Sequence, residues 1–306
     1  MKKLAFFLGK GGVGKTTLSS TVAFQLSREG MKILIVSLDP AHNLGDVFRR
    51  VLSNEKTHLG PNLDAIEINL TTWVARYLKE SRDEIKENYK YNVTMNLDSY
   101  INILKYSPGT EEYAVLWAIE HIYKENEKFY DIIIFDTPPT ALTLRFLAMP
   151  SISLMWVREL SGMRAKILEK RQTVLKLNPE ASVIKGSSKK EDDRIYTRLS
   201  GITSRLAGLH DLFTRQSYLT VVVNPDELSL AEALRIRHEL EKLDVLISSV
   251  CLNKAPDEGE CREKVEGSFQ KFPVFTSFYL PEGIRTVDDL GRIDVEDVKT
   301  DIVKKN

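Results

Sequence analysis

Glycines and lysines at fixed spacing near the start of the chain could bind a nucleoside triphosphate. Gly9, Gly14, Lys15 and Thr16 satisfy the pattern G-x-x-x-x-G-K-[ST]. The glycines let backbone N–H groups close around phosphate oxygens, and the start of a following helix adds positive potential. Lys15 is predicted to reach the β- and γ-phosphates, and the Thr16 hydroxyl suits Mg²⁺. The predicted nucleotide-binding loop comprises Gly9, Lys10, Gly11, Gly12, Val13, Gly14, Lys15, Thr16 and Thr17.

Two aspartates end apolar runs of the kind that form buried strands. Asp39 ends the run at 33–39, and Asp136 ends the run at 132–136. The carboxyl ends of parallel strands meet at one edge of a sheet, where the Asp39 carboxylate can orient or polarise an attacking water. A carboxylate in an apolar strand is costly unless it faces a cation, so Asp136 is predicted to bind Mg²⁺ through a water molecule. Together these groups predict the hydrolysis of a bound nucleoside triphosphate.

The elements that must position these residues are short, continuous apolar runs separated by helical stretches. Such runs are typical of strands buried on both faces of a parallel sheet. A helix is expected to start in the phosphate loop and to end near Gly30. The fold class is therefore α/β, a doubly wound and mainly parallel sheet of the P-loop NTPase type with a helical insertion subdomain. The expected strands are 4–8, 33–39, 63–68, 132–136, 219–223, 245–252 and 274–279.

Two stretches, about 73–129 and about 151–216, have helical patterns and no strand signal. We interpret them as helical insertions into a single domain that spans residues 1–306, and we expect them to lie together beside the sheet. In the second stretch an apolar residue recurs at alternating steps of four and three, which places a stripe along one helix face. The sequence leaves open whether this face is exposed or buried. The stripe consists of Ile195, Leu199, Ile202, Leu206, Leu209 and Phe213.

The composition narrows the class of partner. The 306 residues carry 43 Lys and Arg against 43 Asp and Glu, a balance that gives no general attraction to nucleic acid or to a membrane surface. No continuous apolar run approaches the roughly 20 residues that span a bilayer, and the N-terminus lacks the form of a signal peptide. Two cysteines, Cys251 and Cys261, make no disulfide framework and indicate a reducing cytoplasm.

A second lysine, Lys10, separates this sequence from an ordinary phosphate loop. The segment GKGGVGKTT (9–17) resembles the deviant Walker-A loop of a P-loop subclass. That subclass includes chromosome-partition ATPases, the nitrogenase iron protein and the arsenite-pump/tail-anchor-targeting ATPases. The resemblance implies a homodimer in which Lys10 reaches across the interface to the nucleotide of the partner. A positive charge supplied in this way would act like an arginine finger on the charge that develops during phosphoryl transfer.

Further segments resemble the arsenite-pump/tail-anchor-targeting ATPase family, in the family's order. They are DPAHN (39–43), PGTEE (108–112), DTPPTALTLR (136–145), NPDELSLAEALRI (224–236), CLNK (251–254) and LPEGIRTVDDL (280–290). The resemblance implies that Asp39 is the hydrolytic carboxylate and that Asp226 lies near the nucleotide ribose. It implies that Asn253 contacts the adenine, that Pro281 flanks it, and that the two insertions form the family's helical subdomain.

Two departures from the family pattern bear on metals. The tail-anchor-targeting members commonly carry C-x-x-C for a zinc shared across the dimer, but Cys261 has no second cysteine three residues on. We therefore expect no structural zinc. Leu142 stands where switch II of the family has a histidine, and Cys251 lies inside a predicted strand. These residues do not make a soft-metalloid site, which weakens an arsenite-sensing role.

The leading hypothesis is a cytoplasmic, homodimeric ATPase that uses ATP and Mg²⁺ to shield hydrophobic transmembrane segments of tail-anchored proteins. Its client groove would lie in the helical insertions, with Met155, Trp156 and Met163 as candidate exposed contacts. The expected partners are a second copy of the chain, the client segment and a membrane receptor, with no nucleic acid and no stable membrane insertion. The alternative is the catalytic ATPase subunit of an arsenite efflux pump. A membrane-surface or chromosome-positioning ATPase and an assembly chaperone with an unrelated partner also stay open.

Overall fold

The computed structural model describes residues 3–41, 43–88, 103–178, 189–255, 260–278 and 282–305. The chain divides into two compact units, one made of residues 1–147 with 214–306 and the other of residues 148–213. We call the first the core unit and the second the α6–α7 unit, after its two helices.

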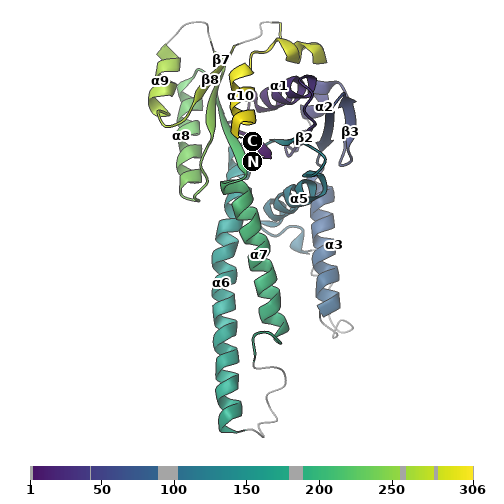
Figure 1. Cartoon of the computed structure of the whole chain (residues 1–306), viewed down its shortest axis with the longest axis vertical. Helices are drawn as coiled ribbons and strands as arrows, with labels where there is room; N and C mark the ends of the chain where they lie inside the picture. Colours follow the sequence, from purple (N-terminus) through teal and green to yellow (C-terminus); the bar gives the residue numbers. More distant parts are fainter. Residues whose placement is uncertain are drawn as a thin grey trace. The chain divides into compact units, whose positions relative to one another are not determined.

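The core unit is built on an eight-stranded sheet with the strand order β3-β4-β2-β5-β1-β6-β7-β8 (Figure 1). Every neighbouring pair is parallel except β3 with β4. This confirms the predicted doubly wound, mainly parallel α/β fold. The strands are β1 (Leu4–Leu8), β2 (Ile33–Ser37), β3 (Thr57–Gly60), β4 (Leu63–Glu67), β5 (Ile132–Asp136), β6 (Ser217–Val223), β7 (Ser249–Ala255) and β8 (Val274–Phe278).

Two strands differ from the sequence prediction. β3 was not predicted, because its four residues Thr57–Gly60 contain a single large apolar side chain and it pairs only at the sheet edge. The strand expected at 245–252 is displaced, and β7 runs from Ser249 to Ala255. Val245 and Ile247 are buried before the strand begins, and an apolar run does not distinguish burial in a loop from burial in a ladder.

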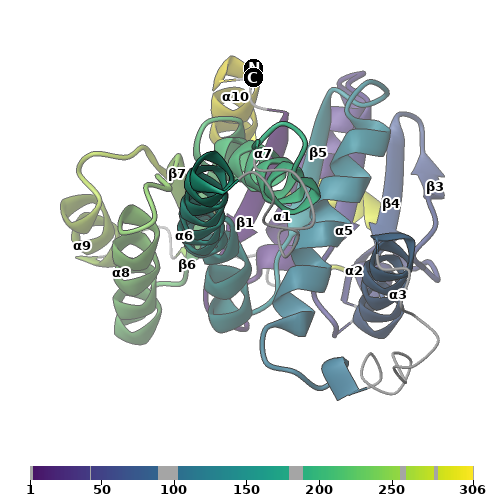
Figure 2. The same cartoon turned by 90° about the horizontal axis from the view of Figure 1, so that it is seen from below.

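Helices cover both faces of this sheet. α1 (Lys15–Arg28), η1 (Val287–Arg292) and α10 (Glu296–Lys305) pack on one face, and α5 (Thr110–Asn126) lies on the other (Figure 1). Figure 2 shows α8 and α9 beside β7, toward one edge of the sheet, and β3 at the opposite edge. The remaining helices of the core unit are α2 (Asn43–Phe48), α3 (Leu70–Asn88), α8 (Glu227–Glu241) and α9 (Glu260–Ser268).

The end of α1 confirms the predicted stop. Gly30 has a φ of 95°, in the left-handed region that glycine adopts without a steric penalty. Its N–H donates to the Ser27 carbonyl, and the Met31 N–H donates to the Leu26 carbonyl. These two bonds satisfy carbonyls that the helix end would otherwise leave unpaired.

The α6–α7 unit is a helical hairpin. α6 (Thr140–Leu177) begins in the core unit and continues through the second, and α7 is Arg194–Thr214. Asp193 joins the two helices: its Oδ1 accepts from the Tyr196 N–H at 2.8 Å at the start of α7. Its two carboxylate oxygens also accept from Arg164 of α6, at 3.0 and 2.6 Å. This forked ion pair fixes the start of α7 to the middle of α6.

The apolar stripe predicted on 195–213 lies on one helix, as expected, but its two halves differ. Leu206, Leu209 and Phe213 are buried, whereas Ile195 and Ile202 are exposed. The first predicted insertion contributes α3 and α5, which belong to the core unit. A joint client-binding role for the two insertions stays a prediction.

One described helix, α6, is long and apolar enough to cross a membrane by length and composition alone. A third of that stretch is buried, and core helices of globular proteins pass the same test. The sequence expectation counted only uninterrupted apolar residues. A mean hydropathy over 18 residues tolerates polar side chains, so α6 meets the second criterion but not the first.

Candidate active site

The loop between β1 and α1 has the backbone that its glycines predict. Gly14 precedes α1 with a φ of 93°, and the Asn253 amide packs where a Cβ on Gly14 would lie. A Cβ on Gly9 would come within 2.6 Å of the Val222 carbonyl oxygen. Both positions therefore require glycine, for a positive φ (151° at Gly9) as well as for close approach. The N-cap residue Gly14 offers no side chain to cap α1, so the first N–H groups of the helix can face an anion.

Lys15, Thr16 and Asp136 come together at the start of α1. The Thr16 hydroxyl donates to Asp136 Oδ2 at 2.7 Å, and the Lys15 ammonium donates to the Lys10 carbonyl at 3.3 Å. Lys15 is buried, and burial lowers the pKa of its ammonium, which the carboxylates of Asp136 and Asp39 oppose. Burial raises the pKa of Asp136 to about 7, against the opposing effects of the Thr16 hydrogen bond and the Lys15 charge.

The same carboxylate fits a magnesium site. Asp136 is fully buried, and its Oδ1 has no hydrogen-bond partner among the residues that the structure describes. A buried, unpaired carboxylate oxygen is costly unless a cation or an ordered water satisfies it. With the Thr16 hydroxyl beside it, this is a hard-oxygen donor set of the kind that Mg²⁺ prefers.

Asp39 lies at the wall of the same site, just after β2. Its Oδ1 accepts from the Ala41 N–H at 3.0 Å, and its own N–H donates to Ser37 Oγ at 3.3 Å. β2 pairs with β5 so that Ser37 lies opposite Asp136, which brings the ends of the two strands together. Both aspartates are therefore at the predicted edge of the sheet.

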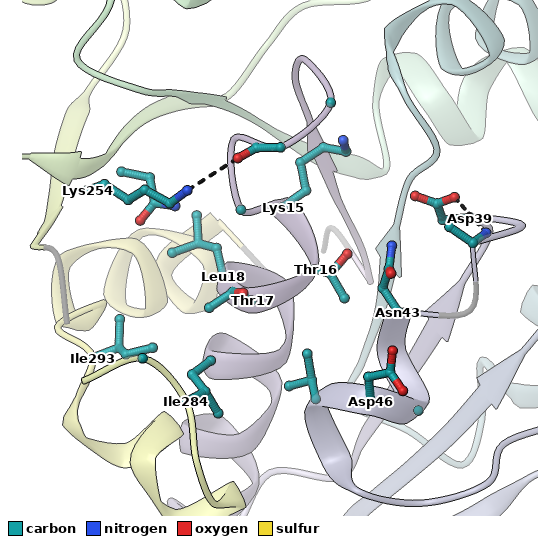
Figure 3. Close-up of a pocket in the computed structure, with 18 of the residues that line it drawn as sticks. Lys15, Thr16, Thr17, Leu18, Asp39, Asn43, Asp46, Lys254, Ile284 and Ile293 are labelled. Atoms are coloured by element: carbon teal, nitrogen blue, oxygen red, sulfur yellow. Dashed lines mark hydrogen bonds between the residues drawn. The ribbon is translucent and has the colours of Figure 1, made fainter. Parts of the chain in front are cut away.

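A cavity of about 1100 Å³ opens beside these groups, within the core unit (Figure 3). Its wall includes Gly11, Gly12, Gly14 and Thr17 from the loop and the start of α1, together with Lys15 and Thr16. The other polar side chains that line it are Asp39, Asn43, Asp46, Arg49, Arg50, Asn253 and Lys254.

The remaining predicted site residues are placed as follows. The Asn253 side chain lines the cavity and donates to the Val13 carbonyl at 2.7 Å. Lys10 is exposed, outside the cavity lining. Asp226 is also outside the lining, and its carboxylate caps α8 by accepting from the Ser229 N–H at 2.8 Å. Pro281 lies outside the described residues. The predicted contacts of Asp226 and Asn253 with ribose and adenine stay predictions.

Sequence reasoning missed Glu67 and Lys254. Glu67 is buried at the end of β4, and its Oε1 accepts from the Gly45 N–H in α2 at 3.2 Å. The signal was available, because Glu67 ends an apolar strand as Asp136 does. Lys254 carried no comparable signal, since its position depends on an irregularity in β7.

The cysteines lie outside this chemistry. Cys251 is fully buried in β7, where burial raises the pKa of its thiol to about 12. The prediction that it is a core residue is confirmed. Within the described parts of the chain no group of three or more His, Cys, Asp and Glu side chains is arranged to hold a metal. The expected lack of zinc stays a prediction.

A glycine-rich loop between a parallel strand and a helix, with a buried lysine and two strand-end carboxylates at one cavity, defines a P-loop ATPase. Residues 2–293 match the family model of the anion-transporting ATPases, and the chain belongs to that family.

Relatives in this family carry two kinds of name. The chain is 32% identical over 277 residues to the putative arsenical pump-driving ATPase 2 of Aquifex aeolicus, covering 88% of this chain and 87% of that protein. It is 30% identical over 274 residues to the ATPase GET3 of Komagataella phaffii, covering 85% and 75% of the two chains. The ATPase get3 of Schizosaccharomyces japonicus is also 30% identical, over 258 residues, with coverage of 82% and 74%. These relatives support the family resemblance drawn from the motifs.

Proposed function

We propose that this ATPase is a cytoplasmic homodimer that shields hydrophobic transmembrane segments of tail-anchored membrane proteins and hands them to a membrane receptor. The observation that carries the proposal is the exposed apolar surface of the α6–α7 unit. Met155, Trp156 and Met163 are 61%, 65% and 60% exposed, which supports this proposal. A compact unit that exposes such side chains is suited to cover apolar surface on a partner.

The core unit supplies the chemistry. Lys15 and the loop N–H groups hold the β- and γ-phosphates, and the Asp39 carboxylate orients the water that attacks the terminal phosphorus. Thr16 and Asp136 would hold Mg²⁺, which neutralises charge on the phosphates when bound. Lys10, exposed in the loop, would reach the nucleotide of the partner subunit.

Client capture is tested by crosslinking a radiolabelled tail-anchored segment to the purified protein, with and without ATP. Replacing Met155, Trp156 and Met163 together with serine should abolish the crosslink while ATP hydrolysis continues. A matched control replaces Phe129, Leu228 and Leu246, which are equally exposed on the core unit. Capture that survives the first triple change, or that is lost equally in the control, would refute the groove.

Roles in hydrolysis are tested separately. Asp39→Asn should retain ATP binding and lose turnover by about 10²–10⁴-fold, because the carboxylate acts on water. Equal loss of binding and turnover would contradict that role. Lys10→Ala alone should lose hydrolysis, and mixing it with subunits that keep Lys10 but cannot bind nucleotide should restore part of it, because the partner then supplies Lys10 to the ATP of the Lys10→Ala subunit. Unchanged activity of Lys10→Ala alone would exclude action across the dimer.

An arsenite-pump subunit is the second candidate, favoured by the names of several relatives. The arsenic(III) centre of arsenite is a soft acceptor that requires accessible thiol ligands. Cys251 is buried, and Leu142 lacks a donor atom. Stimulation of ATP hydrolysis by arsenite would favour this candidate, and an unchanged rate would exclude it.

A further inference from the structure

Lys254 occupies an irregular position in β7. The register between β7 and β8 shifts between Asn253 and Ala255, so Lys254 lies in a bulge. Its φ of 56° is left-handed, a conformation that lysine adopts rarely and glycine freely. It is also the only exposed residue of β7. A bulge beside a cavity commonly turns a side chain toward that cavity.

The bulge changes where the lysine points. In a regular strand successive side chains alternate between faces, so Asn253 and Lys254 would point apart. Here both reach the phosphate loop. The Asn253 amide donates to the Val13 carbonyl. The Lys254 ammonium donates to the Gly12 carbonyl at 3.3 Å (Figure 3). Both side chains line the 1100 Å³ cavity.

The charge of Lys254 is available to an anion. Among the described residues no carboxylate forms an ion pair with it, and a backbone carbonyl accepts from only one of its three N–H donors. Lys15 has the same arrangement, with its ammonium on the Lys10 carbonyl of the same loop. A phosphate oxygen is a stronger acceptor for an ammonium than a neutral carbonyl is.

We propose that Lys254 is a nucleotide-binding residue, held by the β7 bulge so that its ammonium moves from the Gly12 carbonyl to the polyphosphate of the bound nucleotide. The proposal rests on the ATP site described above and adds a cation to it. Lys254 binds the polyphosphate equally well before and during the reaction. It therefore contributes to nucleotide affinity more than to kcat.

The test compares ligands with and without phosphate. In competition with a fluorescent ADP analogue, Lys254→Met should weaken ADP and ATP binding about tenfold and leave adenosine binding unchanged. KM for ATP should rise by a similar factor while kcat stays within about twofold. Lys254→Arg should restore most of the affinity. Lys242→Met is the matched control, because Lys242 pairs with Glu239 on α8, outside the cavity lining, and should change nothing.

A second variant separates the charge from the fold. Lys254→Gly removes the ammonium and relieves the left-handed backbone, so it should melt no lower than wild type and still lose the same nucleotide affinity. The proposal is overturned if Lys254→Met binds ADP normally, if adenosine affinity falls with ADP affinity, or if kcat falls with an unchanged KM. Failure of the ATPase assignment is a different result, in which the wild-type protein itself neither binds nor hydrolyses ATP.

Discussion

The core unit buries most of its apolar side chains, whereas the α6–α7 unit exposes many of its own. In the core unit, six of the eight strands are wholly or mostly buried, and many of the candidate site residues line one cavity. The α6–α7 unit is much smaller, yet it carries more than half of the exposed large apolar side chains among the described residues. These are Ile152, Met155, Trp156, Leu160, Met163, Ile167, Val174, Leu177, Ile195 and Ile202.

The difference in exposure follows from what the proposed role of each unit requires of its side chains. A phosphate site needs a rigid frame, because loop N–H groups and carboxylates must hold fixed positions. A surface that meets varied apolar partners needs accessible, adaptable side chains such as Met and Leu. Within the α6–α7 unit the ion pair Arg164–Asp193 joins the two helices.

The largest expected effect belongs to the core unit. Lys15→Met should lower kcat/KM for ATP about 10³-fold, because it removes the buried cation that we propose binds the phosphates. It should leave hydrogen exchange in α6 and α7 unchanged. Lys3→Met, a change of the same kind at a lysine that binds the Glu127 carbonyl outside the cavity, is the control. Altered exchange in α7 after Lys15→Met would show that the two units are not separable.

The second effect belongs to the α6–α7 unit. Arg164→Met leaves the Asp193 carboxylate without its cation, and both side chains are largely buried, so the local loss of stability should be about 2–3 kcal/mol. Hydrogen exchange at the start of α7 should accelerate while ATP hydrolysis is unchanged. Arg158→Met, at an exposed arginine of α6, should change neither. A fall in ATP hydrolysis with Arg164→Met would contradict the separation of the two units.

The third effect is a pH dependence confined to the core unit. Its origin is the pKa of Asp136, which burial raises from its ordinary value of 3.8 to about 7. Because the folded state holds this proton more tightly, the metal-free protein should lose stability as pH rises from about 4 to 7. Mg²⁺ requires the carboxylate, so Mg²⁺-dependent nucleotide affinity should fall below pH 7, by up to about tenfold per unit.

The pH profile is measured as Mg²⁺-dependent ADP binding from pH 5.5 to 8, with Mg²⁺-free binding as the reference. Asp136→Asn should flatten the profile, because it removes the titrating group. A pH dependence that persists in this variant would assign it to another residue.

Most of the core unit was predictable, because parallel strands are buried on both faces and therefore read as continuous apolar runs. Six of the seven expected strands overlap closely with those observed, and Asp39 and Asp136 stand at their predicted edge. β3 and the start of β7 were not predictable from hydrophobicity. The position of Lys254 depends on a bulge, which no local pattern in CLNK indicates. The apolar stripe on α7 correctly predicted a helix with one apolar face. The exposure of Ile202 and the burial of Leu206 depend on packing against other elements, which helical periodicity does not predict.

The smallest effect is a difference of sign between two glycines, one from each unit. Gly30 has a φ of 95° at the end of α1, so Gly30→Ala should destabilise the core unit by about 1 kcal/mol. Gly208 lies inside α7, and an added Cβ there would meet no atom within 4 Å. Gly208→Ala should therefore stabilise α7 by about 0.5–1 kcal/mol, because alanine restricts the unfolded chain and favours the helix. Thermal unfolding measures the first change and hydrogen exchange in α7 the second. If Gly208→Ala is also destabilising, that face of α7 is covered in solution by a partner, which would move the binding surface from α6 toward α7.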